Sequence, residues 1–432
     1  MHAFEFSIPT RIVFGPGTES RTGELAAGLG ARRVLLVCGG QSARRSGLLD
    51  RVEQSLTQAG LTCRVFAGIH PNPRLFQVRE GVQAALEFGA DLILAVGVAH
   101  VELGGVVPNP RLSKVREGME LCRREGVDFL LAVGGGSVID SAKAIALGAA
   151  EPEADLWDFW LGKRPVERTL PVGAVLTISA AGSETSSSAV LTRDDTLEKR
   201  GLTSEQIRPR FAVMDPELTC SLPPYQIACG VVDIMMHTLD RYFTCVTGNL
   251  LTDEIAQGLL RTVIRCGARA LADPCDLQTM SELMWAGSLS HNGLTGLGAP
   301  KDFAVHQLGH ELSARFDFAH GATLSAVWGS WAEYCVETDP ARFAQYGVSV
   351  WGLDPAGGGQ EELARQAIAR TVDYFRSLGM PTCLTELGCG LQSEEELKEL
   401  ARRCTFYGAR TIGAFRVLGE ADILAIYRAA NR

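Results

Sequence analysis

The first half of the chain alternates short apolar runs with glycine-rich turns. The apolar runs are each followed by small residues or glycines, and they lie at residues 33–38, 128–133 and 170–178. Runs of this length are typical of buried parallel strands, each followed by a turn. We therefore predict an α/β domain with a Rossmann-like parallel sheet over residues 1–216.

The second half of the chain has a different pattern. From about residue 217 the apolar residues recur every three to four positions, as in 255–265 and 361–372, and this spacing predicts amphipathic helices. The chain has 432 residues, which is more than one hydrophobic core normally serves. We predict a separate, all-helical domain over residues 217–432.

A run of three glycines is the clearest ligand signal in the first half. The strand at 128–133 continues into Gly134-Gly135-Gly136-Ser137, and a helix is predicted to follow. Glycines allow a pyrophosphate to approach the backbone, and a helix N-terminus presents free N–H groups to it. Ser137 and Asp140 also fit a capping box, which is the alternative explanation. Because a cap needs no triple glycine, we predict that Gly135, Gly136, Ser137 and Asp140 bind a dinucleotide.

The strand at 33–38 leads into a second glycine turn, Gly39-Gly40-Gln41-Ser42. In dinucleotide-binding folds, an acidic residue near this position holds the ribose 2′-hydroxyl of NADH. No Asp or Glu occurs here, and Ser42 with the two arginines after it would accept a 2′-phosphate. An ordinary turn between strand and helix explains the glycines equally well. We predict that Gly39, Gly40 and Ser42 contact the cofactor and that NADPH is preferred over NADH.

The segment that leads into the triple glycine is duplicated in the sequence. Residues 71–97 and 108–134 are 37 positions apart and are identical at 15 of 27 positions without gaps. A single repeated helix–strand unit is too short for a solenoid, so we interpret the first copy, about 68–104, as an insertion beside the second, 105–137. The first copy would add a strand, exchange places with the second or loop out. We expect no phosphate role for it, because it lacks the last glycine and the serine of the motif.

The second half of the chain concentrates residues that bind metals. Asp233 and His237 are four residues apart, as are His306 and His310, so each pair lies on one face of a helix. Imidazoles and a carboxylate suit Zn²⁺ or Fe²⁺ rather than Ca²⁺ or Mg²⁺. Four protein ligands would fill a tetrahedral ion, so catalysis would require a fifth position or one histidine that does not bind. Surface pairs or core histidines are the alternative.

Three stretches around these histidines, 211–219, 230–237 and 302–321, resemble the iron-containing alcohol dehydrogenase family, and within it the NADPH-dependent butanol and aldehyde dehydrogenases. The resemblance implies a fold like that of dehydroquinate synthase, with a parallel-sheet domain followed by a helical domain. It implies that the metal ligands are Asp233, His237, His306 and His320. His310 would then be a catalytic histidine beside the substrate that does not bind the ion.

The resemblance extends to the first half, where the Gly-Gly-Gly-Ser-x2-Asp-x2-Lys motif of the family occurs without substitution. It implies that Thr177 and Lys199 lie near the cofactor, although Lys199 would equally suit a solvated surface. Ala181 is a departure, because the family has a threonine there. The implied activity is the reversible, metal-dependent and NADPH-linked reduction of short- and medium-chain aldehydes to primary alcohols by a homodimer.

Composition limits the partners of the protein. A net charge of −9 and a pI near 5.5 argue against nucleic acid or an anionic membrane. The N-terminal residues have no basic start and no long apolar run, so no signal peptide is predicted. The 12 cysteines contain no Cys-x2-Cys pair, and we expect reduced thiols. We expect a cytoplasmic protein whose partner is a small aldehyde or alcohol.

Two other functions fit parts of this pattern. A dehydroquinate synthase-like lyase would also use NAD and a metal, but its substrate requires several Lys and Arg residues around the ion, and the helices holding Asp233 and His306 offer few. An inactive metal-binding relic is the other alternative, because the duplication and Ala181 both alter the cofactor region. It predicts bound metal without cofactor binding.

Overall fold

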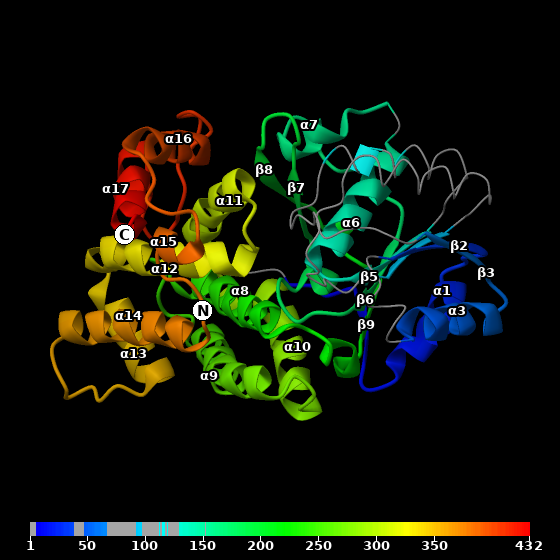
Figure 1. Ribbon diagram of the computed structural model, residues 1–432, viewed down its shortest axis with the longest axis horizontal. Coiled ribbons are helices and arrows are strands. Elements are labelled where there is room, and N and C mark those ends of the chain that lie inside the picture. Colours follow the sequence, from blue (N-terminus) through cyan, green and yellow to red (C-terminus); the bar gives the residue numbers. More distant parts are fainter. Residues whose placement is uncertain are drawn as a thin grey trace. The chain divides into compact units, whose positions relative to one another are not determined.

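The structure is a computed structural model that describes residues 6–38, 47–66, 92–96, 129–151 and 153–432, together with residues 112, 115, 116 and 119. The chain divides into two compact units, one containing Ser7–Pro223 and the other Pro224–Arg432. Figure 1 labels the elements of both units along the chain.

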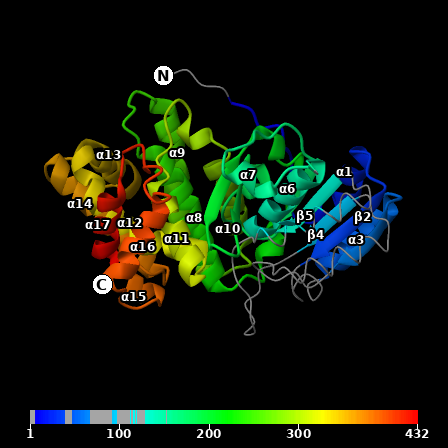
Figure 2. The same cartoon turned by 90° about the horizontal axis from the view of Figure 1, so that it is seen from above.

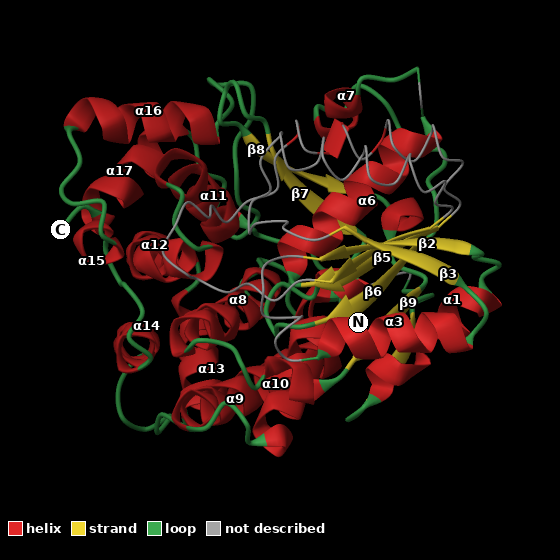
Figure 3. Cartoon of the chain, turned by 45° about the vertical axis from the view of Figure 1, so that its right-hand side comes forward, coloured by secondary structure: helices red, strands yellow, loops and turns green. Residues whose placement is uncertain are grey.

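The Ser7–Pro223 unit contains a parallel sheet whose strands appear in yellow in Figure 3. Its described strands lie in the order β1-β9-β6-β5-β4-β2-β3, and every neighbouring pair is parallel. The three apolar runs of the sequence are confirmed as β2, β5 and β6. The bounds are β1 Arg11–Phe14, β2 Arg33–Cys38, β3 Thr62–Phe66, β4 Leu92–Val96, β5 Phe129–Gly134, β6 Val172–Leu176 and β9 Phe211–Met214.

Helices cover both faces of this sheet, with α6 on one side and α1 and α3 on the other (Figure 1). The bounds are α1 Thr22–Gly28, α3 Leu48–Gln58, α6 Gly136–Ala150 and α7 Leu156–Trp160. Leu25 of α1 and Val52 of α3 pack with Val133 of β5 in one core. On the other side, Leu147 of α6 packs with Trp157 of α7 and with the antiparallel hairpin formed by β7 Ser188–Thr192 and β8 Lys199–Thr203.

The two copies of the repeated module contribute neighbouring strands. Strand β4 belongs to the first copy and lies between β2 and β5, which belongs to the second. Leu92 pairs with Phe129 and Val96 with Val133, so the pairing offset is 129 − 92 = 37, the repeat distance itself. Each position therefore lies beside its own duplicate. Of the three arrangements expected for the first copy, its described strand shows the one that adds a strand to the sheet.

The Pro224–Arg432 unit is built from helices, as predicted (Figure 2). The two amphipathic patterns are confirmed as α9 and α14. The bounds are α8 Pro224–Tyr242, α9 Leu250–Ala272, α10 Leu277–His291, α11 Ala304–Phe316, α12 His320–Cys335, α13 Pro340–Trp351, α14 Gln360–Ser377, α15 Leu384–Leu387, α16 Glu394–Cys404 and α17 Glu420–Ala430. None of the helices in the described part of the chain is long and apolar enough to cross a membrane.

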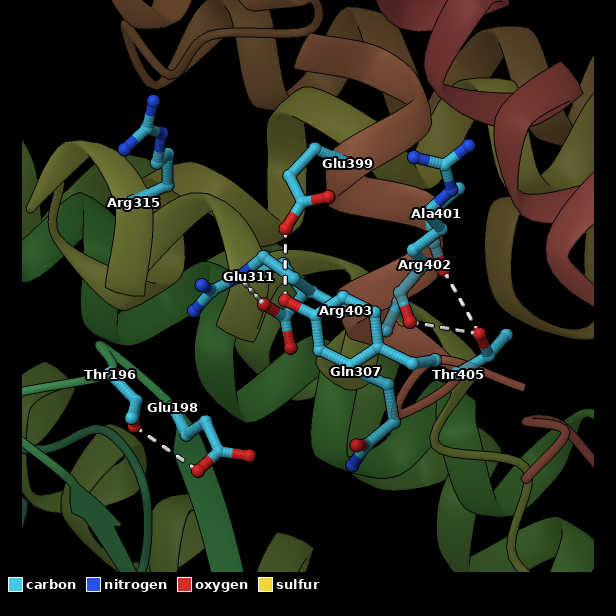
Figure 4. Close-up of polar contacts among 12 residues, drawn as sticks. Thr196, Glu198, Gln307, Glu311, Arg315, Glu399, Ala401, Arg402, Arg403 and Thr405 are labelled. Atoms are coloured by element: carbon cyan, nitrogen blue, oxygen red, sulfur yellow. Dashed lines mark hydrogen bonds and ion pairs between the residues drawn. The ribbon is translucent and has the colours of Figure 1, made fainter. Parts of the chain in front are cut away.

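Two ion pairs join α11 to α16. Glu311 of α11 lies 3.1 Å from Arg403 Nε, and Figure 4 shows this pair between the two helices. Arg315, one turn later, lies 2.6 Å from Glu396. The side chain of Glu311 is only 5% exposed and that of Arg403 14%, so this pair is screened little by solvent. The position of α11 matters because this helix carries two of the predicted site histidines.

Candidate metal and nucleotide sites

Two glycines allow α8, α11 and α12 to approach one another closely. A Cβ atom at Gly321 of α12 would lie 2.2 Å from the carbonyl oxygen of Cys229 in α8. A Cβ atom at Gly309 of α11 would lie 2.8 Å from Leu324 Cδ2 in α12. Any larger residue would force the helices apart. The glycines thus set the distance between the helices that carry the predicted ligands.

Asp233 from α8, His306 from α11 and His320 from α12 form one cluster, and their ligand atoms all lie within 4.8 Å of one another. Asp233 Oδ1 is 3.7 Å from His306 Nε2 and 4.0 Å from His320 Nε2. Asp233 Oδ1 and His306 Nε2 are buried and have no hydrogen-bond partner among the described residues. Burying such atoms without a partner is costly, and a bound cation removes this cost. The cluster therefore fits one divalent ion.

The charges in the cluster also suit an ion. Burial alone would raise the pKa of the Asp233 carboxyl, but His237, His306 and His320 around it hold that pKa well below its usual range. Burial lowers the pKa of His237 and keeps its imidazole neutral. One carboxylate with imidazole nitrogens is a donor set for Fe²⁺ or Zn²⁺.

Asp240 is a functional residue that the sequence analysis missed. His306 Nδ1 lies 2.6 Å from Asp240 Oδ2, and both side chains are buried. This contact holds the His306 ring so that Nε2 faces Asp233, as carboxylates commonly do for metal-binding histidines. The signal was present in the sequence, because Asp233, His237 and Asp240 follow one another at intervals of four and three residues on α8.

The structure places the other two predicted histidines next to this cluster. His237 Nδ1 lies 3.2 Å from Asp233 Oδ1 and donates a hydrogen bond to the Asp233 carbonyl, at 3.0 Å. The His237 ring stacks on His291, with centroids 4.1 Å apart, and is 4.3 Å from the His306 ring. His310 is buried, and its ring centroid lies 5.2 Å from that of His320.

The glycine turn lies at the end of β5, as predicted, but its serine plays a different part. Gly135 precedes α6, and Ser137 lies inside the helix without capping it. The capping box, which was the alternative explanation for Ser137 and Asp140, is therefore not formed, and Asp140 Oδ2 instead accepts the backbone N–H of Val190 at 2.8 Å. A Cβ atom at Gly135 would lie 2.4 Å from Ile178 Cγ2, so the turn packs tightly against the segment after β6.

The remaining predicted cofactor residues are placed as follows. The backbone N–H of Thr177 donates to the Gly134 carbonyl at 3.3 Å, so Thr177 adjoins the glycine turn. Lys199 begins β8 and is only 6% exposed, so the alternative of a solvated surface charge is wrong. Gly39, Gly40 and Ser42 lie outside the described residues.

The architecture is that of the alcohol dehydrogenase class with a sheet domain and a helical metal-binding domain. The crystal structure of NADH-dependent butanol dehydrogenase A from Thermotoga maritima superposes with a TM-score of 0.86 at 32% identity, covering 100% of this chain and 99% of that one. The YqhD structure from Escherichia coli K-12 gives 0.84 at 33% identity, with the same coverage.

Sequence comparison identifies the family. The "Iron-containing alcohol dehydrogenase" profile matches residues 9–101 and 97–216, two segments that meet in the duplicated region, and the C-terminal "Fe-containing alcohol dehydrogenase family" profile matches 227–431. This chain belongs to the iron-containing alcohol dehydrogenase family, whose members are NAD(P)-dependent enzymes acting on alcohols and aldehydes.

Two relatives cover almost the whole chain. NADH-dependent butanol dehydrogenase A of Clostridium acetobutylicum is 37% identical over 99% of both chains. NADPH-dependent aldehyde reductase YqhD of Escherichia coli is 35% identical over 90% of both. The family resemblance noted in the sequence is confirmed.

Proposed function

We propose that this protein is a metal-dependent, NADPH-linked oxidoreductase that reversibly reduces short- and medium-chain aldehydes to primary alcohols. The observation that carries the proposal is the cluster of the buried Asp233 and His306 with the half-buried His320, with Asp240 behind His306. The names of the relatives, butanol dehydrogenase and aldehyde reductase, support the same substrate class.

The helical domain, 217–432, would provide the chemistry. Its ligands would be Asp233, His237, His306 and His320, and a divalent ion on them supplies Lewis-acid polarisation of a carbonyl oxygen. His310, buried beside His320, would deliver a proton to the carbonyl oxygen, and a bound nicotinamide would supply the hydride.

The sheet domain, 1–216, would bind the cofactor. Gly135, Gly136 and Ser137 would hold the pyrophosphate at the start of α6, and Thr177 and Lys199 lie in the same unit. The preference for NADPH rests on the absence of an acidic residue after β2 and on the arginines at 44 and 45. The relatives' names include both cofactors. A cytoplasmic homodimer is part of the proposal.

The proposal is tested by steady-state kinetics with butanal. We expect turnover with NADPH, and a kcat/KM for NADPH at least tenfold above that for NADH. A clear preference for NADH would refute the cofactor assignment alone. Failure to turn over any simple aldehyde, with both cofactors bound, would refute the substrate class and favour the phosphate-dependent lyase.

A further inference from the structure

A fully buried lysine holds the segment from Ser183 to Ser188 in place. Lys143 lies on α6 and its side chain is 0% exposed. Its Nζ donates to the backbone carbonyls of Ser183, Ser186 and Ser188, at 2.7, 3.0 and 2.8 Å. Nζ also lies 2.9 Å from Ser183 Oγ, so the three N–H donors of the ammonium group are shared among three carbonyls and one hydroxyl oxygen.

Asp140, one helical turn before Lys143, holds the same segment. Its Oδ1 accepts the hydroxyl of Ser183 at 2.5 Å, and its Oδ2 accepts the backbone N–H of Val190. The carboxylate is therefore engaged at both oxygens by protein groups. The two charged side chains of α6 together fix the chain from Ser183 to Val190.

The segment follows directly after Ile178 and Ala181, which contact the glycine turn. A Cβ atom at Gly135 would lie 2.4 Å from Ile178, and one at Gly136 would lie 3.4 Å from Ala181 Cβ. The backbone of the turn is thus in direct contact with residues that lead straight into the Lys143-bound segment. If that segment moved, these contacts would shift the backbone of the glycine turn as well.

We propose that Lys143 is a positioning residue for the dinucleotide, whose ammonium group holds the Ser183–Ser188 segment against the glycine turn. The inference rests on the proposed use of this turn for the cofactor phosphates. Without the ammonium group, the carbonyls of Ser183, Ser186 and Ser188 lose a shared donor, and the Ser183 carbonyl keeps, among the described residues, only the N–H of Ser186, so the segment is held less firmly. The glycine turn then loses its packing contacts with Ile178 and Ala181, and its affinity for the cofactor falls.

The charge of the lysine adds a pH signature. Burial lowers the pKa of Lys143 to about 8, against the opposing effect of Asp140 and Glu184 and with the help of Arg208. Lys199 is a further charged group that acts on Asp140. A neutral amine has two N–H donors for these three carbonyls and the Ser183 hydroxyl, so deprotonation would release part of the segment. Cofactor affinity should therefore fall as the pH rises through about 8.

The experiment compares Lys143→Met with Lys163→Met in the metal-loaded, full-length protein. Lys163 is exposed and pairs only at the surface with Asp158, so the control removes the same charge. NADPH binding is measured by fluorescence titration at pH 7. We expect the Kd of the Lys143 variant to rise at least tenfold, with unchanged metal content and with the kinetic loss in KM for NADPH rather than in kcat. The Lys163 variant should match the wild type.

A second variant keeps the test valid if Lys143→Met does not fold. Lys143→Arg retains a charge that stays protonated, so its Kd should not change between pH 7 and 9.5, whereas that of the wild type should rise several-fold. A wild-type Kd that is flat over this range, or an unchanged Kd in a folded Lys143→Met, would overturn the inference. Wild-type protein that binds neither NADPH nor NADH would instead overturn the proposed function.

Discussion

Replacing Asp240 by Asn tests how the metal site is held. Asp240 Oδ2 and His306 Nδ1 are 2.6 Å apart, and their side chains are 1% and 3% exposed. Asn keeps the size of the side chain and an oxygen that accepts a hydrogen bond, but it removes the charge. The change therefore weakens the contact that orients His306 while leaving the ligand itself in place.

The expected loss follows from the nature of this hydrogen bond. A hydrogen bond to a charged group contributes about 1.5–3 kcal/mol and a neutral one about 1 kcal/mol, so the substitution should cost about 0.5–2 kcal/mol of metal binding. Since 1.4 kcal/mol corresponds to a factor of ten, the Kd for the ion should rise about tenfold. This is within the range of about 10- to 100-fold seen when partners of metal-binding histidines are changed.

The pH of the assay matters, because a proton competes with the ion. Burial opposes protonation of His306, but Asp233 and Asp240 together raise its pKa to about 8. Without the Asp240 charge this pKa falls, so proton competition weakens in the variant and masks part of the loss at pH 7. The full difference should appear at pH 9, where His306 is neutral in both proteins.

The Kd for Zn²⁺ is measured by competition with a chromogenic chelator. Asp373→Asn serves as the control, because this carboxylate is 70% exposed and contacts Arg376 only on the surface of α14. Its Kd should equal that of the wild type. If Asp240→Asn also bound Zn²⁺ with wild-type affinity at pH 9, His306 would not depend on Asp240, and the reasoning would be wrong.

Three further predictions concern the sheet domain. Gly135→Ala would place a methyl group 2.4 Å from Ile178, and we expect NADPH affinity to fall at least tenfold at unchanged metal content; equal affinity would show that the turn adapts. Deleting residues 68–104, one repeat length, should leave a folded enzyme that still binds NADPH, because the remaining copy offers the same strand pattern; insoluble protein would contradict this. Burial and the neighbouring Glu19 raise the pKa of Asp215 to about 7, so stability is lost as the pH rises from about 4 through 7, and Glu19→Gln should flatten the fall in Tm across this same pH range.

Local sequence signals predicted the elements well. The apolar run at 33–38 has the bounds of β2, and the helical spacing at 255–265 and 361–372 lies inside α9 and α14. These patterns report burial along one element, which a single stretch of sequence already encodes. Spacing of four residues likewise predicted that Asp233 and His237 share a face of α8.

Contacts between elements could not be predicted from local sequence patterns. The order of the strands, with β4 inserted between β2 and β5, depends on pairing that no local pattern specifies. The role of Asp240 depends on the contact between α8 and α11. The alternative capping box at Ser137 does not form, and Asp140 instead bonds to Val190, 50 residues away. Tertiary hydrogen bonds outweighed a local preference there. The burial of Lys199 depends in the same way on the hairpin packing with α6.

The most direct test of the account is NADPH oxidation with butanal as substrate, measured on metal-stripped protein before and after reloading with Fe²⁺ or Zn²⁺. We expect stripping to abolish the activity and one of the two ions to restore it, because Asp233, His306 and His320 are arranged to hold a single divalent ion. Activity that survives complete removal of the metal, or protein that binds both the ion and NADPH without turning over butanal, would contradict the central claim.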